Sequence, residues 1–437
     1  MSHKNVIGMQ FKILAGFFLA GSFPLLCPNI SFAQTKFFTL DDYLGAALKM
    51  SPLIASSKLE RNSAVYAREG VSRGFLPQIG INSQFILAPS AGYDPAVTNG
   101  GQLGAQLGAS YVLYNGGLKN LQIQKGDLGI IQGTANLKKT QADVLYSTAV
   151  AFAGAVKEKR ELDVLGQNVD LLKDYLTLVR ELHASGQGSE SDVLNTSVEF
   201  ENAKIEADAM AGSYRNALLD LSQSSGVPSD EAADVDTTLT VVRVDTVFHD
   251  TNNVDLAAAL LEKQGADFDA EMVVSQARPS VSLEADAGAL TSLPNLQRGL
   301  ANVLGAEVGI SFTLPIITYG YYDDQYASAH LKAGSISAQN EFLRSSLTAQ
   351  FAQARNNYRQ ANKELELLES NLSTAEKNFA LAKAKYAGGG GSSLEVLNAI
   401  QLINQIEMSM EETRNTIVLS AFKMQRLNYS GTISNGE

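Results

Sequence analysis

The sequence is poor in the residues that carry most protein chemistry. Its 437 residues include one cysteine, four histidines and no tryptophan. A single cysteine cannot form an intramolecular disulfide, and so few cysteines and histidines disfavour a Cys/His zinc site. His183, His249 and His330 lie in no Ser, Cys or Asp arrangement with recognisable catalytic spacing. We therefore expect no enzyme activity, no metal and no cofactor.

The sequence also has little charge. Charged residues make up 18% of the chain, against roughly 25% in ordinary soluble domains, while hydrophobic residues make up 45%. This apolar content disfavours global disorder. The formal net charge of -12 argues against a nucleic-acid partner, because binding to phosphates needs a basic face.

The first 33 residues are typical of an export signal. A short basic start is followed by an apolar run over residues 13–26 and then by Ser31-Phe32-Ala33, whose small residues suit signal peptidase. The run is shorter than the ~20 residues that a spanning helix needs. Leu26 before Cys27 disfavours lipidation of that cysteine but leaves it open. No later segment has 18 consecutive apolar residues, so we expect an exported chain without a spanning helix and, after cleavage, without cysteine.

Two halves of the chain repeat one plan. Residues 186–195 match residues 389–398, including the Val-Leu-Asn that ends each segment. The segments around Phe75-Leu76-Pro77 and Ala277-Arg278-Pro279 stand at a similar offset. One duplicated unit explains these matches better than unrelated domains. We assign residues 34–253 to the first repeat, 254–428 to the second and 429–437 to a C-terminal tail.

Each half contains two stretches in which apolar and polar residues alternate, as in strands with one apolar face. The apolar positions are Ile79, Ile81, Phe85 and Leu87; Leu103, Ala105, Leu107, Ala109, Tyr111 and Leu113; Val281, Leu283, Ala285 and Ala287; and Val308, Ile310, Phe312 and Leu314. Each stretch has about 10 residues, the length of a tilted strand that crosses a bilayer. A soluble sandwich has the same alternation, but the Gly-, Pro-, Asn- and Ser-rich segments 89–101 and 289–302 favour the outer loops of a membrane barrel.

Two very long helices are predicted at residues 117–184 and 321–387, which contain no proline. Their apolar residues recur every 3.5 positions, which is typical of supercoiled helix pairs. We expect the helices to end at Gly186 and at residues 388–391 with a left-handed residue. Ser189 or Ser191, and Ser392 or Ser393, can then cap the returning helices. A phosphate-binding role for the glycine run is disfavoured, because no lysine follows it.

Four membrane strands leave two open sheet edges, which lipid cannot satisfy. Closure therefore needs several chains, and three chains would give twelve strands. Residues that permit bends stand where strands meet helices: Pro77, Gly116, Gly117, Pro279 and Gly320. Tyrosines gather near the same places and are candidates for an interfacial aromatic girdle, although β-propensity alone also explains them: Tyr111, Tyr114, Tyr319, Tyr321 and Tyr322.

With these features in order, the sequence resembles the TolC family of outer-membrane efflux proteins. The resemblance covers residues 39–428 and includes the opening Thr39-Leu40-Asp41-Asp42-Tyr43, the Leu113-Tyr114-Asn115-Gly116-Gly117 motif and the two Gly-rich turns. It implies a mainly α fold with membrane β: a homotrimer with a 12-stranded β-barrel in the outer-membrane lipid and a long α-barrel in the periplasm. It also implies a periplasmic adaptor (membrane fusion) protein and an inner-membrane pump or ABC transporter as partners.

The resemblance further implies a gate at the periplasmic helix tips. By position, Glu395 and Asn398 match the family's acidic ring, and Asp192 and Tyr386 match its tip hydrogen-bond network. The sequence departs from the family in two places. Gly391 stands where an arginine is known and Asn398 where a second acid is known, so we expect a gate that is weaker or held in a different way. For Glu395 alone, a helix N-terminus also favours an acid, which leaves that simpler explanation open.

Two functions are compatible with the heptads. An outer-membrane exit duct for tripartite efflux or type I secretion accounts for both the helices and the strands. A soluble periplasmic coiled-coil adaptor or scaffold accounts only for the helices. Drug, metal and protein export remain open as cargo, because nothing in the sequence selects among them.

Overall fold

The computed structural model describes residues 39–87, 101–228, 235–237, 244–292 and 304–429. The predicted signal segment, Cys27 and residues 430–437 of the predicted tail lie outside the described residues. The described residues belong to one structural unit. Its elements are α1 (Leu40–Met50), α2 (Pro52–Gly74), β1 (Gln78–Leu87), β2 (Gly101–Asn115), α3 (Leu118–Ala184), α4 (Glu190–Ser225), the short 3₁₀ turn η1 (Asp250–Asn252), α5 (Val254–Gln276), β3 (Ser280–Ser292), β4 (Leu304–Thr313), α6 (Tyr321–Ala387) and α7 (Ser393–Leu427).

The order of the elements confirms the predicted duplication. Each half has a helix, two strands, a very long helix and a shorter returning helix, and α3 and α6 both contain 67 residues. The first half has the additional helix α1, because Pro52 lacks an amide hydrogen and begins a new helix after Ser51. The predicted mainly helical, duplicated chain is thus present.

The four strands form one antiparallel sheet in the order β1-β2-β3-β4. Its register places Ile81 opposite Leu107, Leu107 opposite Ala287 and Leu283 opposite Ile310, so the alternating apolar residues of the four strands share one face. The predicted alternation is interrupted at Leu113, because the register of β2 against β3 shifts between Val112 and Tyr114. That face is bare in the chain. The side chains of Ile81, Val308 and Ile310 are 79%, 75% and 71% exposed.

The sheet corrects three predicted boundaries. Gly101 was expected in a loop, but it begins β2 and pairs with Leu87 of β1. Residues 289–292 were expected in a loop, but β3 continues to Ser292, because Leu290 and Thr291 still pair with Gly104 and Leu103 of β2. At the other end, β4 stops at Thr313 and does not include Leu314. Pro315 follows Leu314 and restricts the backbone before it.

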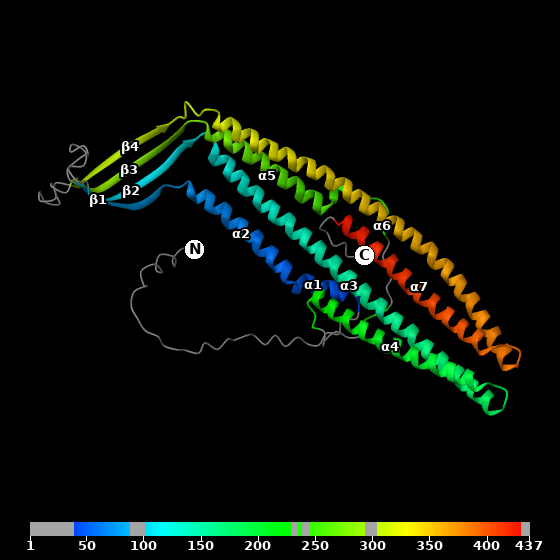
Figure 1. Cartoon of the computed structure of the whole chain (residues 1–437). Helices are drawn as coiled ribbons and strands as arrows, with labels where there is room; N and C mark the ends of the chain where they lie inside the picture. Colours follow the sequence, from blue (N-terminus) through cyan, green and yellow to red (C-terminus); the bar gives the residue numbers. More distant parts are fainter. Residues whose placement is uncertain (1–38, 88–100, 229–234, 238–243, 293–303, 430–437) are drawn as a thin grey trace, which may run out of the picture. The chain divides into compact units, whose positions relative to one another are not determined.

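The long helices pack in pairs (Figure 1). Helix α3 packs against α4, and α6 packs against α7, while α3 also contacts α2, α5 and α7. At 1.5 Å per residue, α3 and α6 are each about 100 Å long. In the described part of the chain, no helix combines the length and apolarity that crossing a bilayer requires.

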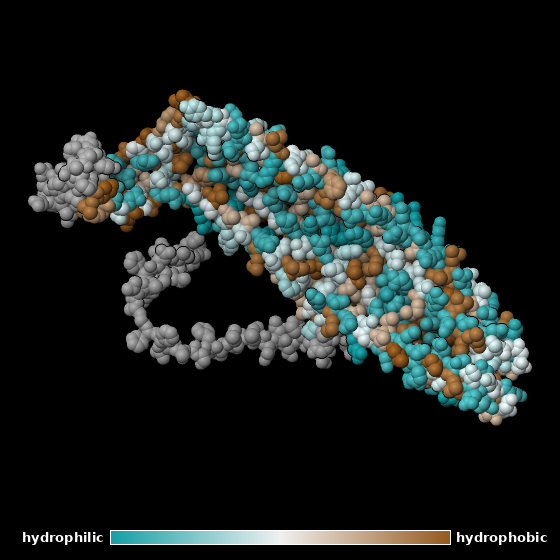
Figure 2. Space-filling view, in the orientation of Figure 1, coloured by the Kyte–Doolittle hydropathy of each residue, from teal (hydrophilic) through white to brown (hydrophobic). Residues whose placement is uncertain are grey.

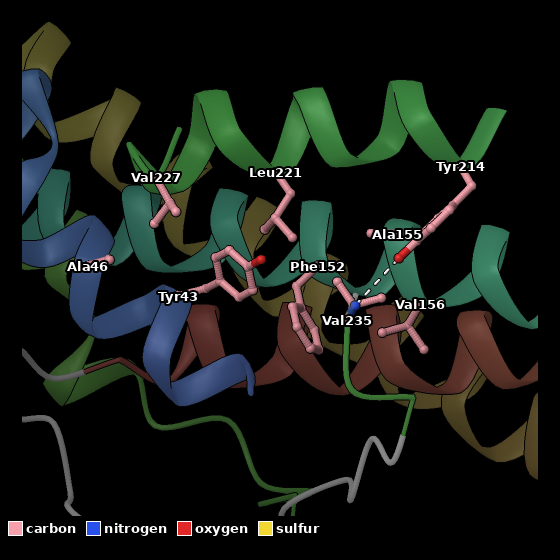
Figure 3. Packing of buried hydrophobic residues seen from close by; sticks show 9 residues of the cluster. All are labelled: Tyr43, Ala46, Phe152, Ala155, Val156, Tyr214, Leu221, Val227 and Val235. Carbon is pink, nitrogen blue, oxygen red and sulfur yellow. Dashed lines mark hydrogen bonds between the residues drawn. The ribbon is translucent and has the colours of Figure 1, made fainter. Parts of the chain in front are cut away.

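A buried cluster fixes α1 between α3 and α4 (Figure 3). Tyr43 of α1 is fully buried, and its ring lies 5.7 Å from that of Phe152 of α3. Leu221 of α4 lies in the same cluster. The amide of Val235 donates to the hydroxyl of Tyr214 over 3.4 Å, which attaches the segment after α4 to that helix. The cluster thus holds together α1, α3 and α4 of the first repeat, although α1 and α4 are far apart in the sequence.

The predicted bend residues lie at the four junctions between helices and strands. Pro77 and Pro279 directly precede β1 and β3. Gly116 and Gly117 have left-handed backbones with φ of 68° and 91°. A Cβ at Gly116 would come 2.2 Å from the carbonyl oxygen of Ser275, so only glycine fits there.

The second repeat makes the same turn with a different residue. Gly320 has a φ of 81°, and Tyr319 before it has a φ of 49°, which is unusual outside glycine. Tyr319 is 95% exposed and meets no crowding of the kind found at Gly116. The turn itself is thus shared, while the need for glycine at its first position comes from the neighbouring helix α5.

Candidate functional site at the helix tips

Each long helix reverses through a short glycine-containing turn. Gly186 and Gly389 have φ of 79° and 77°, the left-handed conformation predicted for the two helix ends. Ser189 caps α4 by accepting a hydrogen bond from the amide of Ser191 over 3.1 Å. Ser392 caps α7 by accepting one from the amide of Glu395 over 3.2 Å. Of the alternative caps, the structure therefore selects Ser189 and Ser392.

A buried apolar cluster lies beneath the two turns. Its members come from all four helices: Leu172, Tyr175, Val179, Ala203, Ala382, Tyr386, Val396, Leu397 and Ile400. Val179 and Val396 are fully buried. The cluster therefore binds the α3–α4 hairpin to the α6–α7 hairpin and sets the position of the turns. The visible surface of the helices, by contrast, is largely hydrophilic, with scattered apolar patches (Figure 2).

Two hydrogen bonds join the hairpins within this cluster. The hydroxyl of Tyr175 (α3) donates to Oγ of Ser393 (α7) over 2.9 Å, and both residues are buried. The hydroxyl of Tyr386 (α6) donates to Oδ2 of Asp192 (α4) over 3.2 Å. The two tyrosine rings meet edge to face, with centroids 5.9 Å apart. We call these four residues the tip cluster.

Both tyrosines of the tip cluster are hydrogen-bond donors at neutral pH. Burial raises the pKa of Tyr175 to about 12, although its hydrogen bond with Ser393 acts in the opposite direction. Burial, and next the negative charge of Asp192, raise the pKa of Tyr386. Since both phenols stay protonated, the two hydrogen bonds persist across the physiological pH range.

The structure brings together only part of the predicted gate set. Asp192 and Tyr386 are hydrogen-bonded. Glu395 and Asn398 lie three positions apart in the first turns of α7, and both are exposed in the single chain. Their common face is therefore available to line an opening.

Sequence reasoning missed Tyr175 and considered Ser393 only as an alternative helix cap. Tyr175 stands between Leu172 and Leu176 in the apolar stripe of α3, where a hydroxyl needs a partner when it is buried. The position of Tyr175 in that stripe therefore signals a buried hydroxyl that needs a hydrogen-bond partner. The identity of its partner, 218 residues away, could not be read from the sequence.

The strands carry a second set of candidate functional residues. Their polar face bears Glu284, Asp286 and Glu307, and the four strands over their described lengths contain no lysine or arginine. Asp286 lies opposite Glu307. One face of the sheet is thus apolar and the other is acidic.

The girdle candidates lie at the ends of β2 and at the start of α6. Tyr114 is the second-last residue of β2, and Tyr111 lies three residues earlier in the same strand. Tyr319 precedes α6, while Tyr321 and Tyr322 begin it, with ring centroids 5.2 Å apart. These positions are those expected of residues at the boundary between strands and helices.

The described residues contain no group of three or more His, Cys, Asp or Glu side chains that could hold a metal ion. His249 contacts the carboxylate of Asp245 through Nε2 over 2.8 Å. The ring of His330 stacks on Tyr326 at 5.8 Å. Both histidines thus have structural neighbours on their own segments.

Comparison with known proteins agrees with this geometry. The family model described as "outer membrane efflux protein" matches residues 43–227 and 250–422. No curated protein matched the chain. Solved structures that are similar in fold over about nine tenths of the chain include three outer-membrane proteins.

The outer membrane protein VceC from Vibrio cholerae is 17% identical, with a TM-score of 0.77, and the match covers 90% of this chain and 97% of that one. The CmeC outer membrane channel of Campylobacter jejuni is 16% identical, with a TM-score of 0.76 and coverages of 91% and 87%. The MtrE outer membrane channel of Neisseria gonorrhoeae, solved in its open state, is 18% identical, with a TM-score of 0.74 and coverages of 90% and 89%. These identities are low, so the likeness establishes the fold.

Proposed function

Because the chain belongs to the outer membrane efflux protein family and is an outer-membrane exit duct, we propose that three copies form this duct as a closed tube. The observation that carries the proposal is the four-stranded sheet. Its apolar face is bare, and in the described structure β1 and β4 each pair on one side only. Lipid cannot satisfy open sheet edges. Joining β1 of one copy to β4 of the next, three times, gives a 12-stranded barrel.

The helices support the same head-to-tail assembly. Helices α4 and α6 are the outer members of the pairs α3–α4 and α6–α7, because the pairs meet through α3 and α7. Each outer helix carries large apolar side chains that are exposed in the single chain. On α6, Leu367 and Leu381 are 66% and 64% exposed; on α4, Leu194 and Ile205 are 60% and 67% exposed. An interface between α4 of one copy and α6 of the next buries both sets and closes a ring. It extends the barrel as a helical tube in the periplasm.

The tube has an apolar outside and an acidic inside at the membrane. The apolar face of the sheet contacts lipid, and the face bearing Glu284, Asp286 and Glu307 lines the lumen. The aromatic girdle at one bilayer surface then consists of Tyr111, Tyr114, Tyr319, Tyr321 and Tyr322. Pro77, Gly116, Gly117, Pro279 and Gly320 turn the chain from the barrel strands into the periplasmic helices.

The periplasmic end is the gate. In a ring of three copies, Glu395 and Asn398 line the mouth, while the hydrogen bond between Tyr386 and Asp192 joins the tips of α6 and α4 within each copy. The duct receives its cargo from an inner-membrane pump or ABC transporter through a periplasmic adaptor that docks on the helical tube. The two repeats, residues 34–253 and 254–428, each supply half of the barrel strands and half of the tip helices of a copy. This role replaces the alternative of a soluble adaptor or scaffold.

Replacing Glu395 with alanine tests the gate. Three carboxylates in a narrow ring favour cations over anions. Glu395→Ala should lower the K⁺/Cl⁻ permeability ratio of the purified channel in planar lipid bilayers by about threefold or more, because one substitution removes the whole ring.

The matched control is Glu190→Ala. Glu190 is also an exposed acid in the first turn of a tip helix, α4, so both variants lose the same interaction with a helix N-terminus. Only Glu395→Ala should change selectivity. Unchanged selectivity, or an equal change in both variants, contradicts the ring. The assembly of three copies is tested separately by the mass of the detergent-solubilised particle.

A further inference from the structure

The tip cluster contains one hydrogen bond that differs from the others at this end of the molecule. Most polar contacts at the tips are exposed, such as the one from Gln401 to Glu199 at 3.4 Å. Tyr175 is 0% exposed and Ser393 is 3% exposed, and their oxygens are 2.9 Å apart. A buried hydrogen bond is costly to break, because neither partner finds water when it is lost.

The two serines at the start of α7 have separate roles. Ser392 is the N-cap, and its hydroxyl accepts from the amide of Glu395. Ser393 is not needed as a cap, so its hydroxyl accepts from Tyr175 on α3. Ser392 thus ends the turn, and Ser393 attaches the turn to the α3–α4 hairpin.

This arrangement occurs once and not twice, although the chain is duplicated. At the offset of 203, Ser393 corresponds to Glu190 and Tyr175 to Asn378. Neither residue retains the hydroxyl of its counterpart. The bond is therefore not a shared property of the turn motif. It is a specific link between the first repeat and the second.

The link also suits a turn with little space at Gly391. A Cβ at Gly391 would lie 3.0 Å from both Cβ of Lys385 and the amide nitrogen of Tyr386. A side chain at this position would require the end of α6 to move by a few tenths of an ångström. Glycine at this position offers no side chain to hold the turn, whereas Ser393 does.

From this geometry we infer that Tyr175, through Ser393, is the positioning residue that holds the mouth of the duct closed. The inference rests on the proposed function, because it assumes that Glu395 and Asn398 line that mouth. Ser393 begins α7 two residues before Glu395. Any widening that moves the start of α7 away from α3 by about 0.7 Å or more breaks the bond, because the two oxygens are then farther apart than a hydrogen bond allows. The Tyr386–Asp192 contact is longer, at 3.2 Å, and joins α6 to α4.

The test measures channel opening in planar lipid bilayers for the wild type, Tyr175→Phe, Ser393→Ala and the double variant. Each single variant removes one hydroxyl from the same hydrogen bond. We expect either to raise the fraction of time spent open by about tenfold, the factor for one hydrogen bond of ordinary strength. The double variant should open no more than the singles, since both remove one interaction.

Tyr214→Phe is the matched control. Tyr214 is a buried tyrosine whose hydroxyl also makes a hydrogen bond, but it lies on α4 about 33 Å from the tip. Its loss should lower the thermal unfolding midpoint about as much as Tyr175→Phe does, without changing opening. Equal opening in Tyr175→Phe and wild type, or increased opening in Tyr214→Phe, overturns the inference alone. Absence of channels in the wild type overturns the proposed function, and this inference with it.

Discussion

Replacing Ile81 with lysine should remove the protein from the outer membrane. Ile81 lies near the middle of β1 on the apolar face, and its side chain is 79% exposed in the single chain. In the closed barrel that side chain contacts lipid. A lysine near the bilayer midplane costs about 2–4 kcal/mol in a membrane barrel, and a trimer carries three copies. The amount of folded protein in the outer-membrane fraction should therefore fall at least about tenfold.

The matched control is Gln84→Lys on the same strand. Gln84 is on the polar face, opposite Gly104, and would face the water-filled lumen. Lysine should be tolerated there, with outer-membrane levels close to those of the wild type. If Ile81→Lys accumulates as well as Gln84→Lys does, the apolar face does not contact lipid.

Replacing Arg426 with methionine should produce the largest loss of stability within the helical part. The Arg426 side chain is 8% exposed and makes hydrogen bonds of 2.7–3.2 Å to the carboxylates of Asp143 on α3 and Asp255 on α5. At the same place, Nδ2 of Asn253, the N-cap of α5, donates to the last carbonyl of α7, that of Leu427, over 2.6 Å. Arg426 thus holds the end of α7 against the start of α5. Breaking a buried pair typically costs about 3–5 kcal/mol.

The residual contact of Asp255 with Lys139 at 3.3 Å puts the expected cost at the lower end of that range, about 3 kcal/mol. The control is Arg68→Met. Arg68 contacts Asp127 over 2.7 Å, but both side chains are much more exposed, so its loss should cost at most about 1 kcal/mol. Guanidinium unfolding of the detergent-solubilised protein measures both. Equal midpoints for the two variants would contradict the assigned role of Arg426.

The same ion pair makes a pH signature. Burial raises the pKa of Asp255, but the hydrogen bonds and charge of Arg426 outweigh that effect, so the pKa lies below its ordinary value of 3.8. A carboxyl whose pKa is depressed by folding stabilises the protein above its unfolded pKa and loses that contribution as the pH falls through its folded pKa. The wild type should therefore lose stability below about pH 4, and Arg426→Met should show a shallower loss in that range.

Local patterns predicted the elements well because each depends on neighbouring residues. The two long stretches without proline predicted α3 and α6 to within a residue of their ends, and the alternation of Ile79, Ile81 and Phe85 identified β1 and its apolar face. The end of β3 was missed because Thr291 and Ser292 resemble loop residues, while their strand structure comes from pairing with β2.

Contacts between distant segments could not be predicted. Tyr175 and Ser393 belong to different repeats, and Arg426 joins three helices that are far apart in the chain. A buried tyrosine or arginine indicates that a partner is needed, but not which one. The link between the hairpins therefore emerged only from the structure, as did the close approach of Lys385 and Tyr386 to Gly391.

The assembly of three chains is the central claim, and the mass of the native particle tests it most directly. Protein extracted from the outer-membrane fraction in mild detergent should give, by light scattering corrected for bound detergent, a polypeptide mass of three mature chains. A polypeptide mass of one chain, or recovery of the protein in the soluble periplasmic fraction, would contradict a duct closed by joining β1 of one copy to β4 of the next.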